Sequence, residues 1–185
     1  MTYDSTGPAA KPSVRDRHKV AWPSLSDILK SPAYLIAFGF GVGLLRPGSG
    51  TWGSVLAALL WPVLTAWLAW DTLGMMIVAS FFLGCVACHR AGQRIGVDDH
   101  VGMVWDEIVA VWMLFWVLPQ NPWVLLTGWI LFRVFDVTKP FPIRIVDARV
   151  KGGLGVMIDD LVAGFYAWLV MLAILMALAS AGVRL

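Results

Sequence analysis

The chain has 185 residues, of which 59% are hydrophobic and 14% charged, and its formal net charge is +2. Eleven tryptophans and nine phenylalanines exclude an ordinary soluble domain and indicate a membrane protein. The length fits one domain. Lysine and arginine are spread over several loops without a basic block, so nucleic acid is not an expected partner.

The first 32 residues differ in composition from the rest. They carry lysine and arginine together with proline and serine, and they lack the apolar core and small-residue cleavage site of a secretory signal peptide. We therefore predict a polar, partly disordered cytosolic leader over residues 1–32. A single helical membrane domain is expected over 33–185.

Six apolar runs follow the leader, at 33–45, 53–70, 73–88, 108–118, 123–135 and 161–181. A helix needs about 20 apolar residues to cross a bilayer, so the runs 53–70, 73–88 and 161–181 are expected to span it. The runs 108–118 and 123–135, joined by prolines 119 and 122, predict a helical hairpin. The short, glycine-rich run 33–45 is expected to be re-entrant or interfacial. The predicted fold is all-α, a membrane bundle of about four to five membrane-associated helices.

The distribution of cations predicts the topology. With a cytoplasmic N-terminus, the outer connections are 71–72, 119–122 and the tail after 181, and Arg184 is the only lysine or arginine there. Carboxylates play no part in this rule, yet the same topology brings six of them to the cytoplasmic face. They are Asp99, Asp106, Glu107, Asp136, Asp159 and Asp160. Charges beside membrane segments are often functional, so we predict one site facing the cytoplasm.

Clustered carboxylates provide the hard oxygen ligands that Mg²⁺ prefers, and Mg²⁺ commonly bridges to phosphate. If one helix covers Asp99 and Asp106, the two share a face, whereas the adjacent Asp106 and Glu107 diverge by about 100°. One acid of each adjacent pair is therefore expected to bind metal and the other to orient a water or a cation. The alternative is that the acids cap helix N-termini, which leaves the second acid of each pair unexplained.

The segment 133–144 supplies the cations Arg133, Lys139 and Arg144. Pro140 and Pro142 predict that the helix ends near Asp136 and that Lys139 projects from an extended segment. Such cations can bind a phosphate and the charge that develops on it during transfer. Attraction to anionic lipid head groups is the alternative, and it suits residues 149 and 151 better than Lys139.

Two glycine-rich segments and one cysteine pair complete the motifs. Residues 48–54 predict either an anion site at a helix start or a plain turn with a serine or threonine cap. Residues 152–155 predict a tight turn close to a ligand. Cys85, Cys88 and His89 match the C-x-x-C-H motif of c-type haem attachment. They are expected in an apolar helix that ends on the cytoplasmic side, where reduced thiols pack as small hydrophobic side chains. No haem is expected.

Four motifs in chain order resemble those of the phosphatidylglycerophosphatase A family. The matching residues are Gly50, Thr51, Gly53 and Ser54; Asp99, His100, Met103, Val104, Asp106 and Glu107; Arg133, Phe135, Asp136, Lys139, Pro140, Pro142 and Ile143; and Gly152, Gly153, Gly155, Met157, Asp159, Asp160, Ala163 and Gly164. The resemblance covers about 38–164. Ser49 stands where many relatives have proline and Ala110 where a glycine is common, which affects local backbone shape and leaves the acids intact.

This resemblance implies a helical, Mg²⁺-dependent enzyme that removes the terminal phosphate of phosphatidylglycerophosphate, giving phosphatidylglycerol at the inner (cytoplasmic) membrane. It implies that Asp99, Asp106, Glu107, Asp136, Asp159 and Asp160 form the acidic, metal-binding centre and that Lys139 contacts the phosphate. We assign catalysis to Asp106, Glu107, Asp136 and Lys139. Substrate binding is assigned to Arg46, Thr51, Ser54, Arg133, Lys139 and Arg144. An aspartyl-phosphate formed on Asp136 and direct attack by water are both open.

Two other functions were weighed. A cation- or proton-coupled transporter also places acids near apolar helices, but it requires them near the bilayer middle. A CDP-alcohol phosphotransferase contains an Asp-Gly-x-x-Ala-Arg core, and residues 147–149 lack its glycine and spacing. A phospholipid in the membrane is the expected substrate, and protein partners are not predicted.

Overall fold

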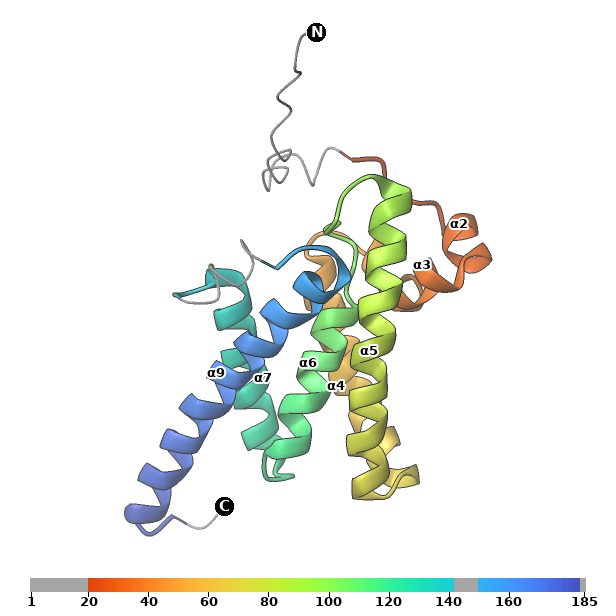
Figure 1. Cartoon of the computed structure of the whole chain (residues 1–185). Helices are drawn as coiled ribbons and strands as arrows, with labels where there is room; N and C mark the ends of the chain where they lie inside the picture. Colours follow the sequence, from red (N-terminus) through yellow and green to blue (C-terminus); the bar gives the residue numbers. More distant parts are fainter. Residues whose placement is uncertain (1–19, 142–149, 184–185) are drawn as a thin grey trace, which may run out of the picture.

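The computed structural model describes residues 20–141 and 150–183, and these residues form helices without a strand. The helices are α2 (Leu25–Lys30), α3 (Pro32–Ala37), the 3₁₀ helix η1 (Gly39–Leu44), α4 (Ser49–Trp67), α5 (Trp70–Ile95), α6 (Trp105–Val117), α7 (Pro122–Thr138) and α9 (Gly152–Ser180). The longer helices run side by side as a bundle (Figure 1). The predicted all-α class is confirmed.

Three helices, α4, α5 and α9, are long and apolar enough to cross a membrane. They correspond to the three runs that were expected to span. The helices α6 and α7 have 13 and 17 residues and form the predicted hairpin. The structure therefore supports three spanning helices by length and composition. The total of four to five membrane-associated helices stays a prediction.

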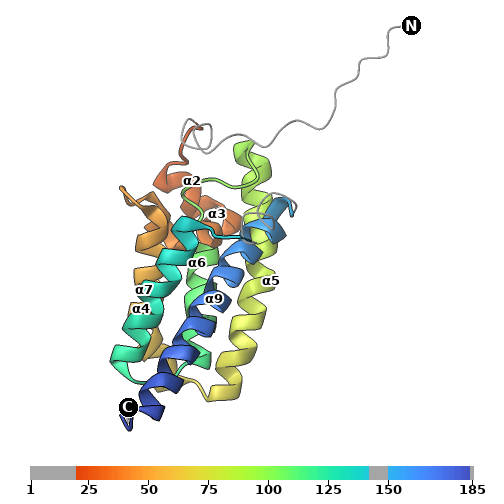
Figure 2. The same cartoon turned by 90° about the vertical axis from the view of Figure 1, so that its left-hand side faces the viewer.

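Helix α6 occupies the middle of the bundle, which both views show (Figure 2). After the first turn its side chains are apolar on every side, and nine residues of the helix are buried, among them Ile108, Val109 and Leu114. A helix that is hydrophobic all round is buried by its neighbours. As a consequence, the first turn of α6 carries Asp106 and Glu107 into the protein rather than to its surface.

Helix α5 extends to Ile95, beyond the predicted end of its apolar run, and Gly96 closes it with a left-handed φ of 86°. Glycine is favoured at this C-terminal position because it has no Cβ to clash. The following residues, up to Val104, form a loop. Asp99 and Asp106 therefore do not share a helix face, contrary to the conditional expectation.

The apolar run 33–45 does not form one helix. It contains the short α3 and η1, and the chain breaks where Phe40 and Gly41 take φ values of 58° and 98°. Neither element is long enough to cross a bilayer. Gly43 packs so closely that a Cβ there would lie 2.0 Å from the carbonyl oxygen of Gly102, so this segment is fixed against the loop that precedes α6.

Residues 20–32, which we assigned to the leader, include helix α2. A capping box closes its start: the Asp27 N–H donates to Ser24 Oγ at 3.2 Å, and the Ser24 N–H donates to Asp27 Oδ2 at 2.9 Å. Ile28 of this helix is completely buried. This part of the segment thus belongs to the packed body, while residues 1–19 lie outside the described residues.

The glycine-rich segment 152–155 is the start of helix α9, not the predicted ligand-binding turn. A Cβ at Gly153 would lie 1.9 Å from the backbone oxygen of Cys85. Only glycine permits α9 to approach α5 this closely. The close approach places Asp159 and Asp160, which follow on α9, beside the first turn of α6.

The two ends of the bundle differ in character. The α4–α5 and α6–α7 connections lie at one end, while α2, α3, the loop before α6, the end of α7 and the start of α9 lie at the other (Figures 1 and 2). Among the described charged residues, Asp71 alone is at the α4–α5 connection. The polar chemistry is therefore concentrated at the end that holds the start of α6.

Candidate functional site

A cavity of about 630 Å³ lies at this polar end, between α4, α6, α7 and α9. Its lining includes the six acids that were predicted to form the metal centre: Asp99, Asp106, Glu107, Asp136, Asp159 and Asp160. Three cations, Arg46, Arg133 and Lys139, line it as well. Segments that are distant in sequence thus meet around one space, and the contacts within it divide the acids into groups.

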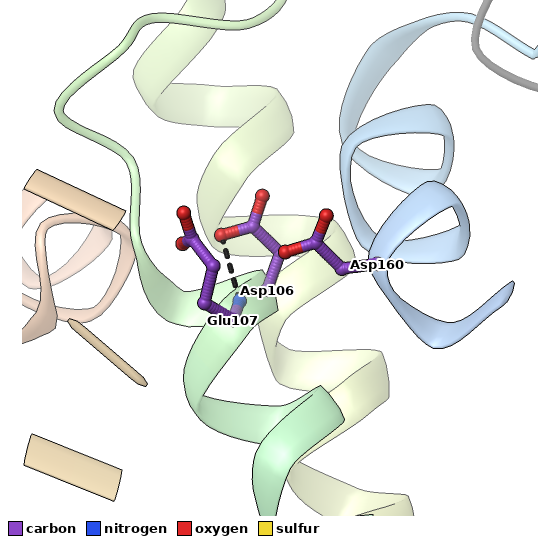
Figure 3. Close-up of side chains that lie close together, drawn as sticks. All are labelled: Asp106, Glu107 and Asp160. Atoms are coloured by element: carbon purple, nitrogen blue, oxygen red, sulfur yellow. Dashed lines mark hydrogen bonds between the residues drawn. The ribbon is translucent and has the colours of Figure 1, made fainter. Parts of the chain in front are cut away.

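Three of the acids form a compact group, the acid trio of Asp106, Glu107 and Asp160. One carboxylate oxygen from each lies within 4.8 Å of the other two. The first two come from the start of α6 and the third from α9, and their carboxylates lie side by side (Figure 3). The Glu107 N–H also donates to Asp106 Oδ1 at 3.1 Å. Asp106 and Asp160 are buried and Glu107 is partly buried.

The acid trio carries an unbalanced charge. Glu107 Oε2 and Asp160 Oδ2 are both buried and have no hydrogen-bond partner. Ionised carboxylates this close repel strongly in a low-dielectric interior, and a buried charge without a partner is costly. A hard divalent cation would remove both problems, and oxygen ligands of this kind are those that Mg²⁺ binds. The residues present therefore fit such an ion.

The two adjacent pairs of acids are arranged differently, and which acid of each pair would hold a metal stays a prediction. Asp106 and Glu107 both belong to the trio, because the Asp106 carboxylate turns to accept the neighbouring N–H at the helix start. The second pair does divide. Asp160 joins the trio, while Asp159 forms an ion pair with Lys139.

Two ion pairs form the other side of the cavity. Arg133 Nη1 lies 2.5 Å from Asp136 Oδ2, three residues along α7, a spacing that suits a helical pair. Arg133 Nη2 also donates to Thr51 Oγ1 of α4 at 3.2 Å. Lys139 Nζ contacts Asp159 Oδ2 of α9. Asp136 and Asp159 are thus each paired with a cation at the cavity. Their role as metal ligands stays a prediction.

The backbone of Lys139 also differs from the prediction. Helix α7 continues to Thr138, and Lys139 is its C-cap in the left-handed region, with φ 41° and ψ 63°, instead of an extended residue. Its N–H donates to the Phe135 carbonyl at 2.9 Å and closes the last turn. This conformation, together with the ion pair to α9, directs the ammonium group to the cavity lined by the acids.

The segment 48–50 supports the trio. Gly48, with a φ of 74°, is the N-cap of α4 and no side chain caps the helix, so the alternative of a serine or threonine cap is wrong. A Cβ at Gly50 would lie 1.9 Å from Glu107 Oε1, which makes glycine necessary there. The Ser49 hydroxyl donates to the Val101 carbonyl and ties this segment to the loop before α6.

The other predicted substrate-binding residues do not all lie at the cavity. Ser54 is completely buried, its hydroxyl donates to the Thr51 carbonyl at 2.9 Å, and it does not line the cavity. Thr51 reaches the site through its contact with Arg133. Arg144 lies outside the described residues. Arg46 does line the cavity.

Trp22 lines the cavity, although no motif or pattern in the sequence singles it out. It lies in the segment that composition assigned to a polar leader, and one tryptophan among eleven is no signal by itself. Its neighbour in the structure is Arg46, whose guanidinium carbon is 3.7 Å from the Trp22 ring centroid. This contact joins a residue before α2 to the segment that leads into α4.

Known proteins resemble this chain over the region that contains these site residues. The family model for phosphatidylglycerophosphatase A matches residues 35–175. The chain is 41% identical over 147 residues to phosphatidylglycerophosphatase A of Haemophilus influenzae, covering 79% of this chain and 90% of that protein. It is 39% identical over 154 residues to phosphatidylglycerophosphatase A of Escherichia coli, covering 82% of this chain and 88% of that protein. No solved structure matches the chain. The matched region contains the acid trio and both ion pairs, and the chain belongs to the phosphatidylglycerophosphatase A family.

Proposed function

We propose that this protein is a Mg²⁺-dependent phosphatase that hydrolyses the terminal phosphate of phosphatidylglycerophosphate and yields phosphatidylglycerol at the cytoplasmic face of the inner membrane. The relatives from Haemophilus influenzae and Escherichia coli, which match over most of the chain, carry this activity in their names. The observation that carries the proposal is the acid trio with two unpartnered buried oxygens, in one cavity with Arg133 and Lys139.

The metal would be held by Asp106, Glu107 and Asp160. A bound divalent cation supplies charge neutralisation for phosphate oxygens. Asp99 lines the same cavity and belongs to the proposed acidic centre without being part of the trio. The acyl chains of the substrate would stay in the bilayer beside the apolar helices α4, α5 and α9, and the head group would enter the cavity at the polar end.

Arg133 and Lys139 would bind the oxygens of the terminal phosphate through charge-assisted hydrogen bonds. Their partners Asp136 and Asp159 hold them at the cavity before substrate arrives. The same contacts then stabilise the charge that spreads over the phosphoryl oxygens during transfer. In this proposal Asp136 and Asp159 hold the cations, whereas the sequence predicted that all six acids bind metal.

Two routes fit the position of Asp136. In one, its carboxylate oxygen attacks phosphorus, the bond from phosphorus to the glycerol oxygen breaks, and water later hydrolyses the aspartyl-phosphate. In the other, the carboxylate accepts a proton from a water that attacks phosphorus directly. Both consume one water and give phosphatidylglycerol and inorganic phosphate. A transporter is less consistent with the fold, because the carboxylates line one cavity and come from the loop before α6, the start of α6, the end of α7 and the start of α9, which lie at one end of the bundle.

Release of inorganic phosphate from phosphatidylglycerophosphate in detergent micelles tests the proposal. The purified protein should release phosphate with Mg²⁺, lose activity in EDTA and recover it when Mg²⁺ is added in excess. Protein with Asp106→Asn, prepared in parallel, is the control for a contaminating phosphatase. Failure to release phosphate with any divalent ion would reject the activity. Release that EDTA does not affect would reject the metal dependence alone.

A further inference from the structure

Arg46 differs from the other cations of the cavity in its surroundings. Arg133 and Lys139 are each paired with a carboxylate. Within residues 20–141 and 150–183, no carboxylate lies within ion-pair distance of Arg46, and its guanidinium instead lies over the ring of Trp22. A cation–π contact orients a guanidinium without neutralising its charge. The N–H donors of Arg46 thus stay available for an anion.

Trp22 is itself held in place. Its ring makes an edge contact with the completely buried His100, with ring centroids 4.8 Å apart. On another side it packs on the backbone at Gly102, where a Cβ would lie 2.9 Å from Trp22 Cζ3. The ring therefore gives Arg46 a rigid support on the wall of the cavity.

The position of Arg46 along the chain keeps it close to the acid trio. Gly50 contacts the Glu107 carboxylate, and four residues of chain span at most roughly 14 Å. Arg46 thus lines the same cavity as the trio, but it lies on a different part of the cavity wall. A ligand with two anionic groups, separated by a short linker, could engage both.

The substrate under the proposed function has this form. It carries a terminal phosphomonoester, which is removed, and an internal phosphodiester, which remains in the product, with a glycerol unit between them. We propose that Arg46, held on Trp22, binds the internal phosphodiester, while the trio, Arg133 and Lys139 act on the terminal phosphate. The proposal rests on the proposed function. Trp22 acts as a positioning residue, and it precedes the region 35–175 that matches the family.

Two inhibitors separate the two phosphate positions. Phosphatidylglycerol retains the diester and lacks the terminal phosphate, whereas inorganic phosphate resembles only the terminal group. In mixed micelles, Arg46→Gln should raise the inhibition constant of phosphatidylglycerol and the KM for the substrate about 10- to 100-fold, as expected for a charged hydrogen bond. The inhibition constant of inorganic phosphate should not change.

Substitutions of Trp22 test its positioning role. Trp22→Phe keeps an aromatic face for the guanidinium and should retain the wild-type inhibition constant of phosphatidylglycerol within about threefold. Trp22→Leu should raise this constant and leave that of inorganic phosphate unchanged. Arg94→Gln is the matched control, because Arg94 lies 5.9 Å from the Tyr34 ring centroid and lines a different cavity. Its constants should equal those of the wild type.

Each outcome is decisive. An unchanged inhibition constant for phosphatidylglycerol in Arg46→Gln overturns the inference, and so does an equal rise for inorganic phosphate, which would place Arg46 on the reacting group. If Arg46→Gln turns over too slowly for kinetics, the rise in its Tm on adding phosphatidylglycerol measures the same affinity. No phosphate release by the wild type rejects the proposed function, and this inference with it, whereas an active wild type with unchanged variants rejects the inference alone.

Discussion

The carboxylates of Asp106, Glu107 and Asp160 have oxygens within 4.8 Å of one another, and in their ionised form this arrangement costs folding free energy that a bound cation would offset. Their burial costs solvation, and their mutual repulsion adds to it. A cation that binds only the folded state would stabilise it by mass action. The side chains thus predict that activity and thermal stability respond together to a divalent metal.

Asp160→Asn removes one ligand and one of the repelling charges. Its kcat/KM should fall by more than about 100-fold, because even residues that merely support metal ligands cost 10- to 100-fold when replaced. Mg²⁺ should raise the Tm of the wild type and have little effect on the variant. The measurements are phosphate release and thermal unfolding with Mg²⁺ or EDTA.

Asp71→Asn is the control for this experiment, since Asp71 is exposed in the first turn of α5 at the opposite end of the bundle. It should behave like the wild type in both measurements. A full Mg²⁺ response of the Tm in Asp160→Asn would exclude Asp160 as a ligand, and wild-type turnover would remove it from the site.

Residue types alone could not separate these roles. Asp136 and Asp159 resemble the trio in sequence, being acids beside apolar runs, and we predicted all of them as metal ligands. In the structure Asp136 pairs with Arg133 of the same helix, and Asp159 of α9 pairs with Lys139 at the end of α7. Which carboxylate meets a cation and which meets another carboxylate depends on side-chain positions that periodicity does not specify.

The helices position the site through close contacts at glycine. Gly50 of α4 lies against the Glu107 carboxylate, and Gly153 of α9 lies against the backbone of α5. Each contact leaves no room for a Cβ. Residues 48–54 were predicted to form either an anion site or a plain turn, and residues 152–155 a tight turn close to a ligand. Their observed contribution is to let neighbouring helices approach until the acids meet.

Gly50→Ala tests this contribution. An added Cβ would lie 1.9 Å from Glu107 Oε1, so the carboxylate must move, and a displacement of about 1 Å in a catalytic site can cost 100-fold in rate. We expect a loss of kcat of about this size with a folded protein, measured by phosphate release and gel filtration in detergent.

Gly164→Ala is the matched control within a helix. A Cβ there would meet the Ala110 oxygen at 3.6 Å, which is an ordinary contact, and alanine is favoured over glycine in a helix by about 0.8–1 kcal/mol. Its activity should be normal and its Tm equal or higher. Normal activity in Gly50→Ala would show that the position of Glu107 tolerates this shift.

The bundle as a whole separates a polar end from an apolar body. The loop before α6, the end of α7 and the start of α9 lie at the polar end with α2 and α3, and the α4–α5 connection lies at the other (Figure 1). Cationic loops face the cytoplasm in most membrane proteins. The polar end, with the cavity, is therefore expected on the cytoplasmic side.

Accessibility of single cysteines would test this orientation. In a background with Cys85→Ser and Cys88→Ser, which should keep activity because we assign the thiols no role, Thr72→Cys and Lys151→Cys place one thiol at each end on exposed positions. A membrane-impermeant maleimide should label Thr72→Cys in spheroplasts and Lys151→Cys only in inverted vesicles. The reverse pattern would contradict the orientation, and an inactive but folded double serine variant would contradict our view of the thiols.

Composition and the lengths of the apolar runs were enough to predict an all-helical membrane protein and its three long helices, and the distribution of lysine and arginine added the end of the bundle where the acids meet. Those properties follow from hydrophobic burial, chain length and charge distribution, which are local. The division of the acids between the trio and the ion pairs, the left-handed cap at Lys139 and the place of Trp22 beside Arg46 depend on how the chain packs in three dimensions. The contacts involved depend on how closely the helices pack, and the distance between two packed helices cannot be derived from hydropathy or from motif spacing.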